Sequence, residues 1–531
     1  MTLPVRENPY SFAGFLEKRD KLDFYRDDPF IQKVVKKYAA GEWDSLHQKL
    51  LEFSSKVSFR WSRLAEKSAY PEVRPYIQHY DAYNRRIDRI VRPLEMHQLE
   101  KEVFSEGLFS ENTSPWEYFA KLFLLHQMGE AGVMCPLACT EGLIALINYY
   151  PDHGFPDLDY IYRHCKEGLN GDFAIGAQYM TEIQGGSDIP SNLMEAEPDG
   201  RYYRVYGSKF FCSAVHADYA VVTAKVTGSE KVGTFIVPSW LPGDKEKEKR
   251  NGYVINRIKW KLGTVELPTA EIDFHGALAY PIGPTDRGVA NAVGIVLTLS
   301  RMAVGVSSAA IVTRAAREAL LYSEFRDVFG EKINRHPLAA NQLEDIVAAA
   351  KRATAGAFKI YDLFIKLGRK LQPGLFSNEP PEMQKARFDL RELILLQKIC
   401  TSFEAVDTVR KAISIFGGHG VIEDFSSLPR LLRDVLVNEL WEGPRNVLLM
   451  QIYRDLQRVS QFYSPGEFVL SLLKGGDEKK AREMASWLVE ILGKSAPIDR
   501  AGGLGAAAEW ERFCEELFRT YQGIALDEVE R

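Results

Sequence analysis

Residues 173–180 read FAIGAQYM and run directly into TEIQGGSD at 181–188. The first string is a short apolar run of the kind that forms a β-strand, and the second has the glycines and polar residues of a turn. Its two glycines let backbone approach a ligand closely, and Thr181 and Ser187 add hydroxyl groups. The strings therefore predict a strand that ends either in a ligand-binding loop or in an ordinary hairpin turn.

The same pattern of short strand-like runs separated by turn residues continues to about residue 274. Four further runs alternate or stay apolar, with turn signals such as PDG and LPGD between them: 201–214, 219–226, 233–239 and 269–275. Together with the first strand they predict a β domain over 174–280. In GSKFFCSA (207–214), the two-residue period places Phe211 and Ser213 on one face. That face suits either core packing or a flat heterocycle that stacks and hydrogen-bonds there.

On both sides of this β domain the pattern is helical. Apolar residues recur at three- and four-residue spacings over 1–173, in a long run rich in small residues within 281–458, and in the tail 459–531. Strands and helices do not alternate and no GxGxxG follows a strand, which argues against a doubly wound dinucleotide fold. We predict an α+β, mainly α protein: an N-terminal helical domain, a β domain, a helical bundle and a helical C-terminal extension.

Charge and cysteine content argue against several classes of protein. The 67 Lys and Arg against 72 Asp and Glu give a net charge of −5, which does not suit a general nucleic-acid binder. Six cysteines in 531 residues are too few for a disulfide framework, and nothing completes a zinc site around Cys135 and Cys139, so we expect reduced thiols and no metal. The first 20 residues lack the apolar core of a signal peptide, and no run reaches 18 apolar residues. We therefore expect a cytoplasmic protein with no membrane span.

Two glycine-containing strings lie in the predicted bundle. RDVFG (326–330) comes at the end of a long helical run, where Gly330 can end the helix. Arg326 can meet a diphosphate there, or simply the helix dipole. SIFGGHG (414–420) follows another helical run, and its three glycines leave bare backbone. This string suits a loop lying on a cofactor or a tight connection.

The string LWEGPRN (440–446) places Glu442 between an aromatic residue and Gly-Pro. In an apolar pocket the charged form of a carboxyl group is disfavoured, which raises its pKa toward that of a useful base. The plain alternative is an acid at the start of a new helix, and the string in isolation favours that alternative.

In order and spacing, MTEIQGGSD, GSKFFCSA, RDVFG, IFGGHG and PRLLRDVLVNELWEG resemble the acyl-CoA dehydrogenase family over roughly residues 110–455. The Gln-Gly-Gly of the first string and Asn446 after WEG are most similar to the alkylation-response, AidB-like branch. The resemblance implies a helical domain, a β-barrel-like domain and a four-helix bundle. It also implies that FAD lies between the last two and that the substrate is an acyl-CoA.

The resemblance assigns roles to single residues. FAD contacts within one chain are expected from Tyr179, Met180, Thr181, Gly186, Ser187, Phe211, Ser213 and Asn446. FAD contacts from a neighbouring subunit, and hence a homodimer or homotetramer, are expected from Arg326, Phe329, Ser414, Ile415, Gly417 and Gly418. Substrate contacts are expected from Ser187, Arg301, Trp441 and Gly443, and the acyl pocket from 135–147. Pro444 stands where the family usually has Thr, and Ser414 stands where it often has Gln.

By this resemblance Glu442 is the catalytic base. It removes the α-proton of the thioester while the β-hydride passes to flavin N5, which yields the trans-2-enoyl thioester. Some members carry the base before an arginine of the bundle, but here that position is Ser300, so Glu442 has no rival. The expected electron acceptor is an electron-transfer flavoprotein, with oxygen as the alternative.

The alternative function is that of an AidB-like flavoprotein with a DNA-protective or other non-dehydrogenase role. The tail 461–531 holds nine Lys and Arg and thirteen Asp and Glu, so its net charge is 9 − 13 = −4. Such a tail cannot supply many phosphate contacts. We therefore expect no nucleic-acid partner.

Overall fold

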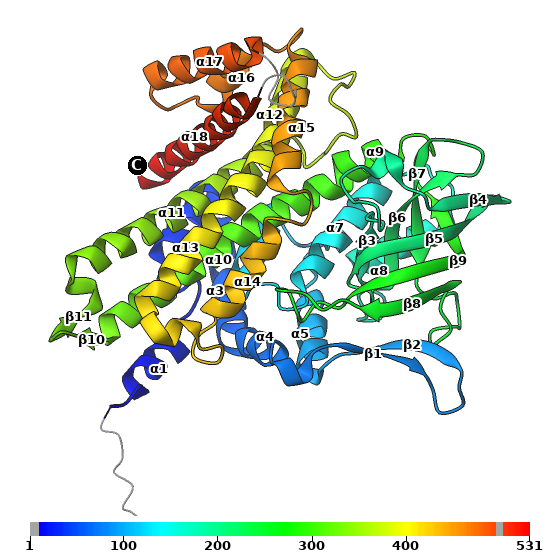
Figure 1. Ribbon diagram of the computed structural model, residues 1–531, viewed down its shortest axis with the longest axis horizontal. Helices are drawn as coiled ribbons and strands as arrows, with labels where there is room; N and C mark the ends of the chain where they lie inside the picture. Colours follow the sequence, from blue (N-terminus) through cyan, green and yellow to red (C-terminus); the bar gives the residue numbers. More distant parts are fainter. Residues whose placement is uncertain (1–9, 495–502) are drawn as a thin grey trace, which may run out of the picture.

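The computed structural model describes residues 10–494 and 503–531, and its regions follow one another in the predicted order (Figure 1). Figure 1 shows the β domain on one side, with the long helices of the bundle extending away from it. The start of the N-terminal string weighed above as a signal peptide and most of the break between the last two helical patterns lie outside the described residues.

The N-terminal region is mainly helical. Its helices are α1 (Ala13–Asp20), α2 (Pro29–Tyr38), α3 (Trp43–Ser55), α4 (Ser62–Ser68), α5 (Leu94–Phe104), α6 (Pro115–His126), α7 (Met134–Tyr149) and α8 (Pro156–Lys166). Every residue of α6 from Trp116 to its end is buried, as expected of a helix that is apolar on most faces. Together with α7 it forms one wall of the site described below.

A hairpin of strands β1 (Tyr76–Tyr80) and β2 (Arg86–Val91) interrupts this region, so the prediction of helix throughout 1–173 is wrong there. Asp88 ties the hairpin to the β domain, because its Oδ2 accepts a hydrogen bond from Ile255 N at 2.9 Å. Arg86 Nη2 in turn donates to Ile255 O at 3.0 Å. The hairpin thus gains its stability from strands far along the chain, which the local pattern could not reveal.

The middle domain is a closed sheet, as the barrel-like prediction requires. Its strands are β3 (Gly176–Tyr179), β4 (Glu195–Asp199), β5 (Tyr202–Ser213), β6 (Tyr219–Val226), β7 (Val232–Pro238), β8 (Tyr253–Ile258) and β9 (Thr269–Pro281). They follow the order β3-β6-β4-β5-β9-β7, and β6 also pairs with β7, which closes the ring. Strand β3 lies parallel to β6 outside the ring and leads to the TEIQGGSD loop. The hydrogen bond from Gln178 of β3 to Glu442 places the start of that loop beside the bundle.

The bundle is built around α10 (Leu297–Phe325), which is buried along most of its length. The elements around it are α9 (Gly288–Asn291), the hairpin β10 (Asp327–Val328) and β11 (Glu331–Lys332), α11 (Pro337–Lys366), α12 (Pro381–Leu396), α13 (Ser402–Phe416), α14 (Leu428–Asn438) and α15 (Arg445–Val459). Small residues let the helices approach: a Cβ on Gly305 would lie 2.7 Å from Gln397 Cγ in the turn between α12 and α13. The predicted four-helix bundle is therefore confirmed.

The extension consists of α16 (Pro465–Leu472), α17 (Glu478–Gly493) and α18 (Gly503–Glu530). Helix α18 runs back along α11, and Lys359 Nζ of α11 lies 2.8 Å from Glu528 Oε1. Its last residues reach α2, where Lys33 Nζ donates to Glu530 O at 2.9 Å. The extension thus packs on both the bundle and the N-terminal region.

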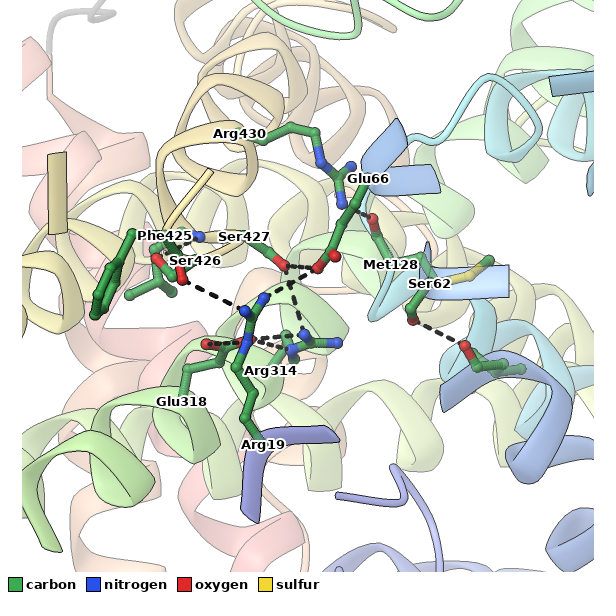
Figure 2. Close-up of polar contacts among 12 residues, drawn as sticks. Arg19, Ser62, Glu66, Met128, Arg314, Glu318, Phe425, Ser426, Ser427 and Arg430 are labelled. Carbon is green, nitrogen blue, oxygen red and sulfur yellow. Dashed lines mark hydrogen bonds and ion pairs between the residues drawn. The ribbon is translucent and has the colours of Figure 1, made fainter. Parts of the chain in front are cut away.

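A buried ion network fastens α1 to the bundle (Figure 2). Arg314 Nη2 lies 2.6 Å from Glu318 Oε1 within α10, and Arg19 Nη2 of α1 lies 3.2 Å from Glu66 Oε1 of α4. Ser427 Oγ donates to the same oxygen of Glu66 at 2.7 Å, and Arg19 Nε is 3.7 Å from Glu318 Oε2. Loss of one member would leave an uncompensated buried charge, so the network holds α1 in one place.

The segment Gly288–Phe325 is long and apolar enough, by composition, to cross a membrane. However, 94% of its most apolar window is buried inside the protein, as expected of the central helix of a bundle.

Candidate active site

Glu442 lies in the short loop between α14 and α15. Its backbone has a positive φ of 60°, and Gly443 follows with a φ of 106°. A non-glycine residue in this region stores strain on the order of 1–3 kcal/mol and persists only where its surroundings hold it. Pro444 then caps α15, where its missing N–H is harmless. The sequence Glu-Gly-Pro thus produces a sharp, strained turn that presents the carboxyl group.

Two buried cations hold this turn through its backbone carbonyls. Arg301 Nε of α10 donates to Glu442 O at 2.9 Å. Lys398 Nζ, from the turn between α12 and α13, donates to Gly443 O at 2.6 Å and to Glu439 O at 2.9 Å. Bonds from charged donors are stronger than neutral ones, and these three offset the strain of the turn. Arg301, predicted to contact substrate, thus lies beside the base, whereas Lys398 was missed.

The carboxyl group of Glu442 accepts a hydrogen bond from Gln178 Nε2 of β3 at 2.7 Å. The same amide nitrogen lies 3.2 Å from Ser300 Oγ. Burial raises the pKa of Glu442 to about 7, although the positive charges of Arg301 and Lys398 and the bond from Gln178 act to lower it. The group is therefore half deprotonated near neutral pH, which is the condition of an efficient general base.

A narrow cavity of about 30 Å³ lies against this carboxyl group. The lining residues come from α6, α7 and the loop between them, from α10, from the last residue of α14 and from the loop that follows it. They are His126, Glu130, Met134, Cys135, Ala138, Cys139, Ser300, Ala303, Val304, Ser307, Asn438, Trp441 and Glu442. Trp441 Nε1 donates to Asn438 Oδ1 at 2.9 Å, which sets the orientation of the indole. Trp441 and part of 135–147 thus line one cavity with Glu442, whereas His126 and Glu130 were missed.

The loop TEIQGGSD is anchored by a buried ion pair. Lys209 Nζ of β5 lies 2.8 Å from Glu182 Oε1, and Leu193 N donates to Glu182 Oε2 at 2.6 Å. A Cβ on Gly186 would collide with Thr181 Oγ1, so glycine is required there. Of the predicted cofactor residues in this segment, Tyr179 and Met180 are buried, Thr181 and Gly186 are half-buried, and Ser187 is exposed.

Strand β5 presents the predicted face of Phe211 and Ser213. Phe211 is 48% exposed and Ser213 is half-buried, whereas Cys212 between them is buried, so the shared face of Phe211 and Ser213 is confirmed. A register shift between Lys209 and Cys212 interrupts the predicted alternation of the string. Lys259 Nζ lies 4.6 Å from the centre of the Phe211 ring, and Ser213 Oγ lies 3.1 Å from Thr269 Oγ1. A half-exposed ring beside hydroxyls and an ammonium group is the donor set that a flat, polar-edged heterocycle needs.

The string RDVFG forms the hairpin β10–β11 rather than a helix end. Helix α10 ends at Phe325, and the positive φ of both Phe329 (50°) and Gly330 (88°) makes a two-residue hairpin turn, so the prediction that Gly330 ends the helix is wrong. Phe329 at its tip is 99% exposed. Arg326, at the base of the hairpin, stacks on Tyr10 with 4.7 Å to the ring centre.

The string SIFGGHG lies at the same end of the bundle. Ile415 is buried, whereas Ser414, Gly417 and Gly418 are exposed. The hydroxyl oxygen of Tyr322, near the end of α10, lies 2.8 Å from Nδ1 of His419 in this string. At 1.5 Å per residue, Arg326 lies about 37 Å along α10 from Arg301. One chain therefore does not bring these two strings to Glu442.

Asn446 is exposed on the first turn of α15. It borders a separate hollow of about 490 Å³ between α15 and α18, together with Pro444 and Arg445. Arg445 pairs with Glu511 and Glu515 of α18. The C-terminal extension therefore reaches the residues that directly follow the base.

Three family models match consecutive parts of the chain: the adaptive response protein AidB N-terminal domain over 16–154, the acyl-CoA dehydrogenase middle domain over 177–277, and the acyl-CoA dehydrogenase C-terminal domain over 286–457. Acyl-CoA dehydrogenase family member 11 of Caenorhabditis elegans is 30% identical over 480 residues, which cover 85% of this chain and 74% of the relative. This chain belongs to the acyl-CoA dehydrogenase family. Both the predicted family and the AidB-like branch are confirmed, and the family is one of oxidoreductases that dehydrogenate acyl-CoA.

Other members of the acyl-CoA dehydrogenase family resemble the chain over nearly its whole length. The putative acyl-CoA dehydrogenase AidB of Escherichia coli is 26% identical over 546 residues, covering 95% of this chain and 94% of the relative. The structure of Caenorhabditis elegans ACDH-11 in complex with C11-CoA aligns with a TM-score of 0.83 at 26% identity, over 99% of this chain and 92% of that one. An acyl-CoA dehydrogenase of Bacillus anthracis complexed with FAD shares the fold, with a TM-score of 0.67 at 16% identity over 97% and 85% of the chains.

Proposed function

We propose that this chain binds FAD and dehydrogenates an acyl-CoA thioester to the trans-2-enoyl-CoA, with Glu442 as the base. The observation that carries the proposal is the setting of Glu442, whose carboxyl group lies on a narrow cavity and has a pKa of about 7. A general base must lie within reach of the proton it removes and must be deprotonated at working pH. The turn clamped by Arg301 and Lys398 holds the carboxyl group on the cavity. A pKa of about 7 leaves a substantial fraction of it deprotonated near neutral pH and makes that carboxylate more basic than an ordinary glutamate.

The residues of the barrel fit FAD. The exposed ring of Phe211 offers a stacking surface, and the hydroxyl group of Ser213 lies on the same face of β5. The half-buried Thr181 and Gly186 bring hydroxyl and backbone groups to the loop that follows β3. FAD bound on this side supplies the acceptor for the β-hydride, while the protein positions the thioester.

The turn itself offers a donor for the thioester carbonyl. The backbone N–H of Glu442 has no hydrogen-bond partner among the described residues. It belongs to the residue that takes the α-proton, so carbonyl polarisation and deprotonation take place at one point of the chain. A fixed donor aimed at an oxygen that gains negative charge lowers the barrier to removing the α-proton.

We also propose that the active protein is a homo-oligomer. RDVFG and SIFGGHG lie together at the end of α10 remote from Glu442, about 37 Å away by helix length. If both strings contact FAD as the resemblance implies, they contact the FAD of a neighbouring subunit. The full exposure of Phe329 supports this, since a large apolar side chain at a hairpin tip gains from a partner surface.

The test is anaerobic flavin reduction by a panel of acyl-CoA thioesters, from short to long and from straight to branched. The FAD-loaded wild type should lose its flavin absorbance with at least one thioester. Glu442→Gln should bind the same thioester and reduce flavin about 100- to 10,000-fold more slowly, because only the base is lost. Glu483→Gln, which removes an exposed carboxylate of α17, is the matched control and should behave as wild type.

Wild-type protein that holds FAD but is reduced by no thioester would contradict the dehydrogenase proposal and leave the AidB-like, non-dehydrogenase alternative. Once reduced, the flavin also tests the acceptor. We propose an electron-transfer flavoprotein, which should reoxidise the flavin much faster than dissolved oxygen does.

A further inference from the structure

His126 is a buried polar side chain without a partner. It is the last residue of α6, is 3% exposed, and lines the cavity that also holds Glu442. Within the described part of the chain, neither Nδ1 nor Nε2 of its ring makes a hydrogen bond. Burial of an unpaired polar group costs stability, and a leucine at this position would avoid the cost. An imidazole facing a substrate cavity in this state is therefore explained best by a ligand.

A second polar group, Glu130, faces the same cavity. It is 4% exposed, and its Oε1 accepts a hydrogen bond from Cys135 N at 3.1 Å. The thiol of Cys135 lies near both carboxyl groups, since Glu442 acts to raise its pKa and it acts in turn to raise that of Glu130. Glu130, Cys135 and Glu442 therefore lie close to one another in the lining of this cavity.

Burial favours the uncharged form of both groups. Burial lowers the pKa of His126 to about 3, and burial raises that of Glu130 well above its usual range. A neutral imidazole offers one N–H donor and one acceptor nitrogen, and a protonated carboxyl group offers an O–H donor and an acceptor. Among the described residues, no Lys or Arg lines the cavity itself. The polar wall is complementary to a neutral oxygen function.

We propose that the substrates of this protein are acyl thioesters whose acyl chain carries a hydroxyl group, and that His126 is the residue that recognises it. The inference rests on the proposed function, because it places the hydroxyl-bearing part of the acyl chain in the cavity beside Glu442, whose volume of about 30 Å³ admits one small polar group. A plain hydrocarbon chain would leave the imidazole buried and unpaired, whereas a hydroxyl group pairs with either ring nitrogen. Sites built to bond a substrate hydroxyl reject the analogue that lacks it far more strongly than apolar pockets reject an added one.

The experiment compares octanoyl-CoA with its 5-, 6-, 7- and 8-hydroxy derivatives, with Kd measured by calorimetry on the FAD-loaded Glu442→Gln variant so that turnover does not interfere. At least one hydroxy isomer should bind about 10- to 100-fold more tightly than octanoyl-CoA. In the background of that variant, His126→Leu should abolish the preference while binding of octanoyl-CoA is kept or improved. His126→Leu should also raise the melting temperature of the ligand-free protein, because it removes an unpaired buried group.

His126→Gln is the second variant, since its amide keeps a donor and an acceptor and should retain part of the preference. His275→Leu, which changes an exposed histidine of β9, is the control and should leave both the preference and the melting temperature unchanged. If His126→Leu does not fold, the isomer panel on the parent protein and His126→Gln still decide. Equal binding of octanoyl-CoA and all four isomers, or a preference that survives in His126→Leu, overturns the inference.

This outcome is distinguishable from failure of the proposed function. If wild-type flavin is reduced by octanoyl-CoA and the hydroxy isomers alike, with no preference in Kd, the dehydrogenase proposal stands and the role of His126 falls. If none of the five thioesters, nor any of the wider panel, reduces the flavin, the dehydrogenase proposal falls first.

Discussion

The two ends of α10 differ in how far their residues are buried and bonded within one chain. At the first end, Arg301 is buried and bonded to the Glu442 turn, and Ser300 lies beside Gln178. At the other end, Phe329 is 99% exposed. The first end holds the proposed base through bonds from its own chain, whereas the second presents a large apolar side chain to solvent. The difference supports the two proposals that residues of the same chain hold the base and that the second end contacts a neighbouring subunit.

Apart from the loss of Glu442 itself, the most damaging change to the first end is expected from Arg301→Gln. The Glu442 turn is strained and loses its bond from the guanidinium group to Glu442 O, so the carboxyl group loses its position. Misplacement by about 1 Å costs on the order of 100-fold in rate, and we expect flavin reduction to slow by at least that factor. Stopped-flow flavin reduction measures it. Arg454→Gln, at an exposed site on α15, is the control, and equal rates in both variants would contradict the clamp.

The second end is probed by Phe329→Asp. If Phe329 docks on a neighbouring subunit, a charge at this tip should weaken FAD binding by about 10- to 100-fold, since a charge buried at an interface without a partner is costly. Equilibrium dialysis of FAD and mass measurement by light scattering report the two effects. Leu504→Asp alters a side chain that is 91% exposed on α18 and should change neither. Unchanged mass and FAD affinity in Phe329→Asp would place the oligomer interface elsewhere.

The pH dependence of flavin reduction tests the role of Glu442 and Gln178 at the first end of α10. Burial raises the pKa of Glu442 to about 7, so flavin reduction should increase as pH rises through 7 and the base deprotonates. The bond from Gln178 acts to lower this pKa, so Gln178→Leu should move the midpoint to higher pH. The rate at pH 7 should then fall a few-fold and recover at pH 9. A variant that is equally slow at both pH values would show that Gln178 acts through something other than the pKa.

The raised pKa of Glu442 also makes the stability of the folded protein depend on pH. The folded pKa of about 7 lies above the ordinary value of 4.5, so the folded protein holds this proton more tightly than the unfolded chain does. The contribution of Glu442 to stability is thus fully present below pH 4.5 and is lost as pH rises toward 7. Glu442→Gln should lack this component, which denaturant unfolding at pH 5 and pH 8 would reveal.

The smallest effect is expected from Tyr322→Phe at the second end. It removes the 2.8 Å contact between the tyrosine oxygen and His419 Nδ1 and leaves the stacked rings in place. We expect a loss of about 1 kcal/mol in the free energy of unfolding and no change in flavin reduction once FAD is saturating. A slowed reduction at saturating FAD would mean that the two ends are coupled, against the comparison above.

Local sequence patterns predicted much of the fold. Strands β3 to β9 lie between Gly176 and Pro281, within the range where the spacing predicted them, and Phe211 and Ser213 share a face, because side-chain period follows directly from backbone geometry. The hairpin β1–β2 and the turn at Phe329–Gly330 were missed. Both are short, and short elements give too few residues for a period to be counted.

The sequence by itself determined the family and the order of the domains, because both follow from motifs and side-chain spacings that are read directly along the chain, and it gave the hypothesis that Glu442 is the base. Only the tertiary structure decided what surrounds Glu442. Gln178 bonds it from 264 positions away, and Arg301 and Lys398 come from other helices. The cavity with its unpaired His126 likewise exists only once α6, α7 and α10 meet. The physical reason is that a pKa or a cavity belongs to an environment, and an environment is made by residues that the chain brings together only when it folds.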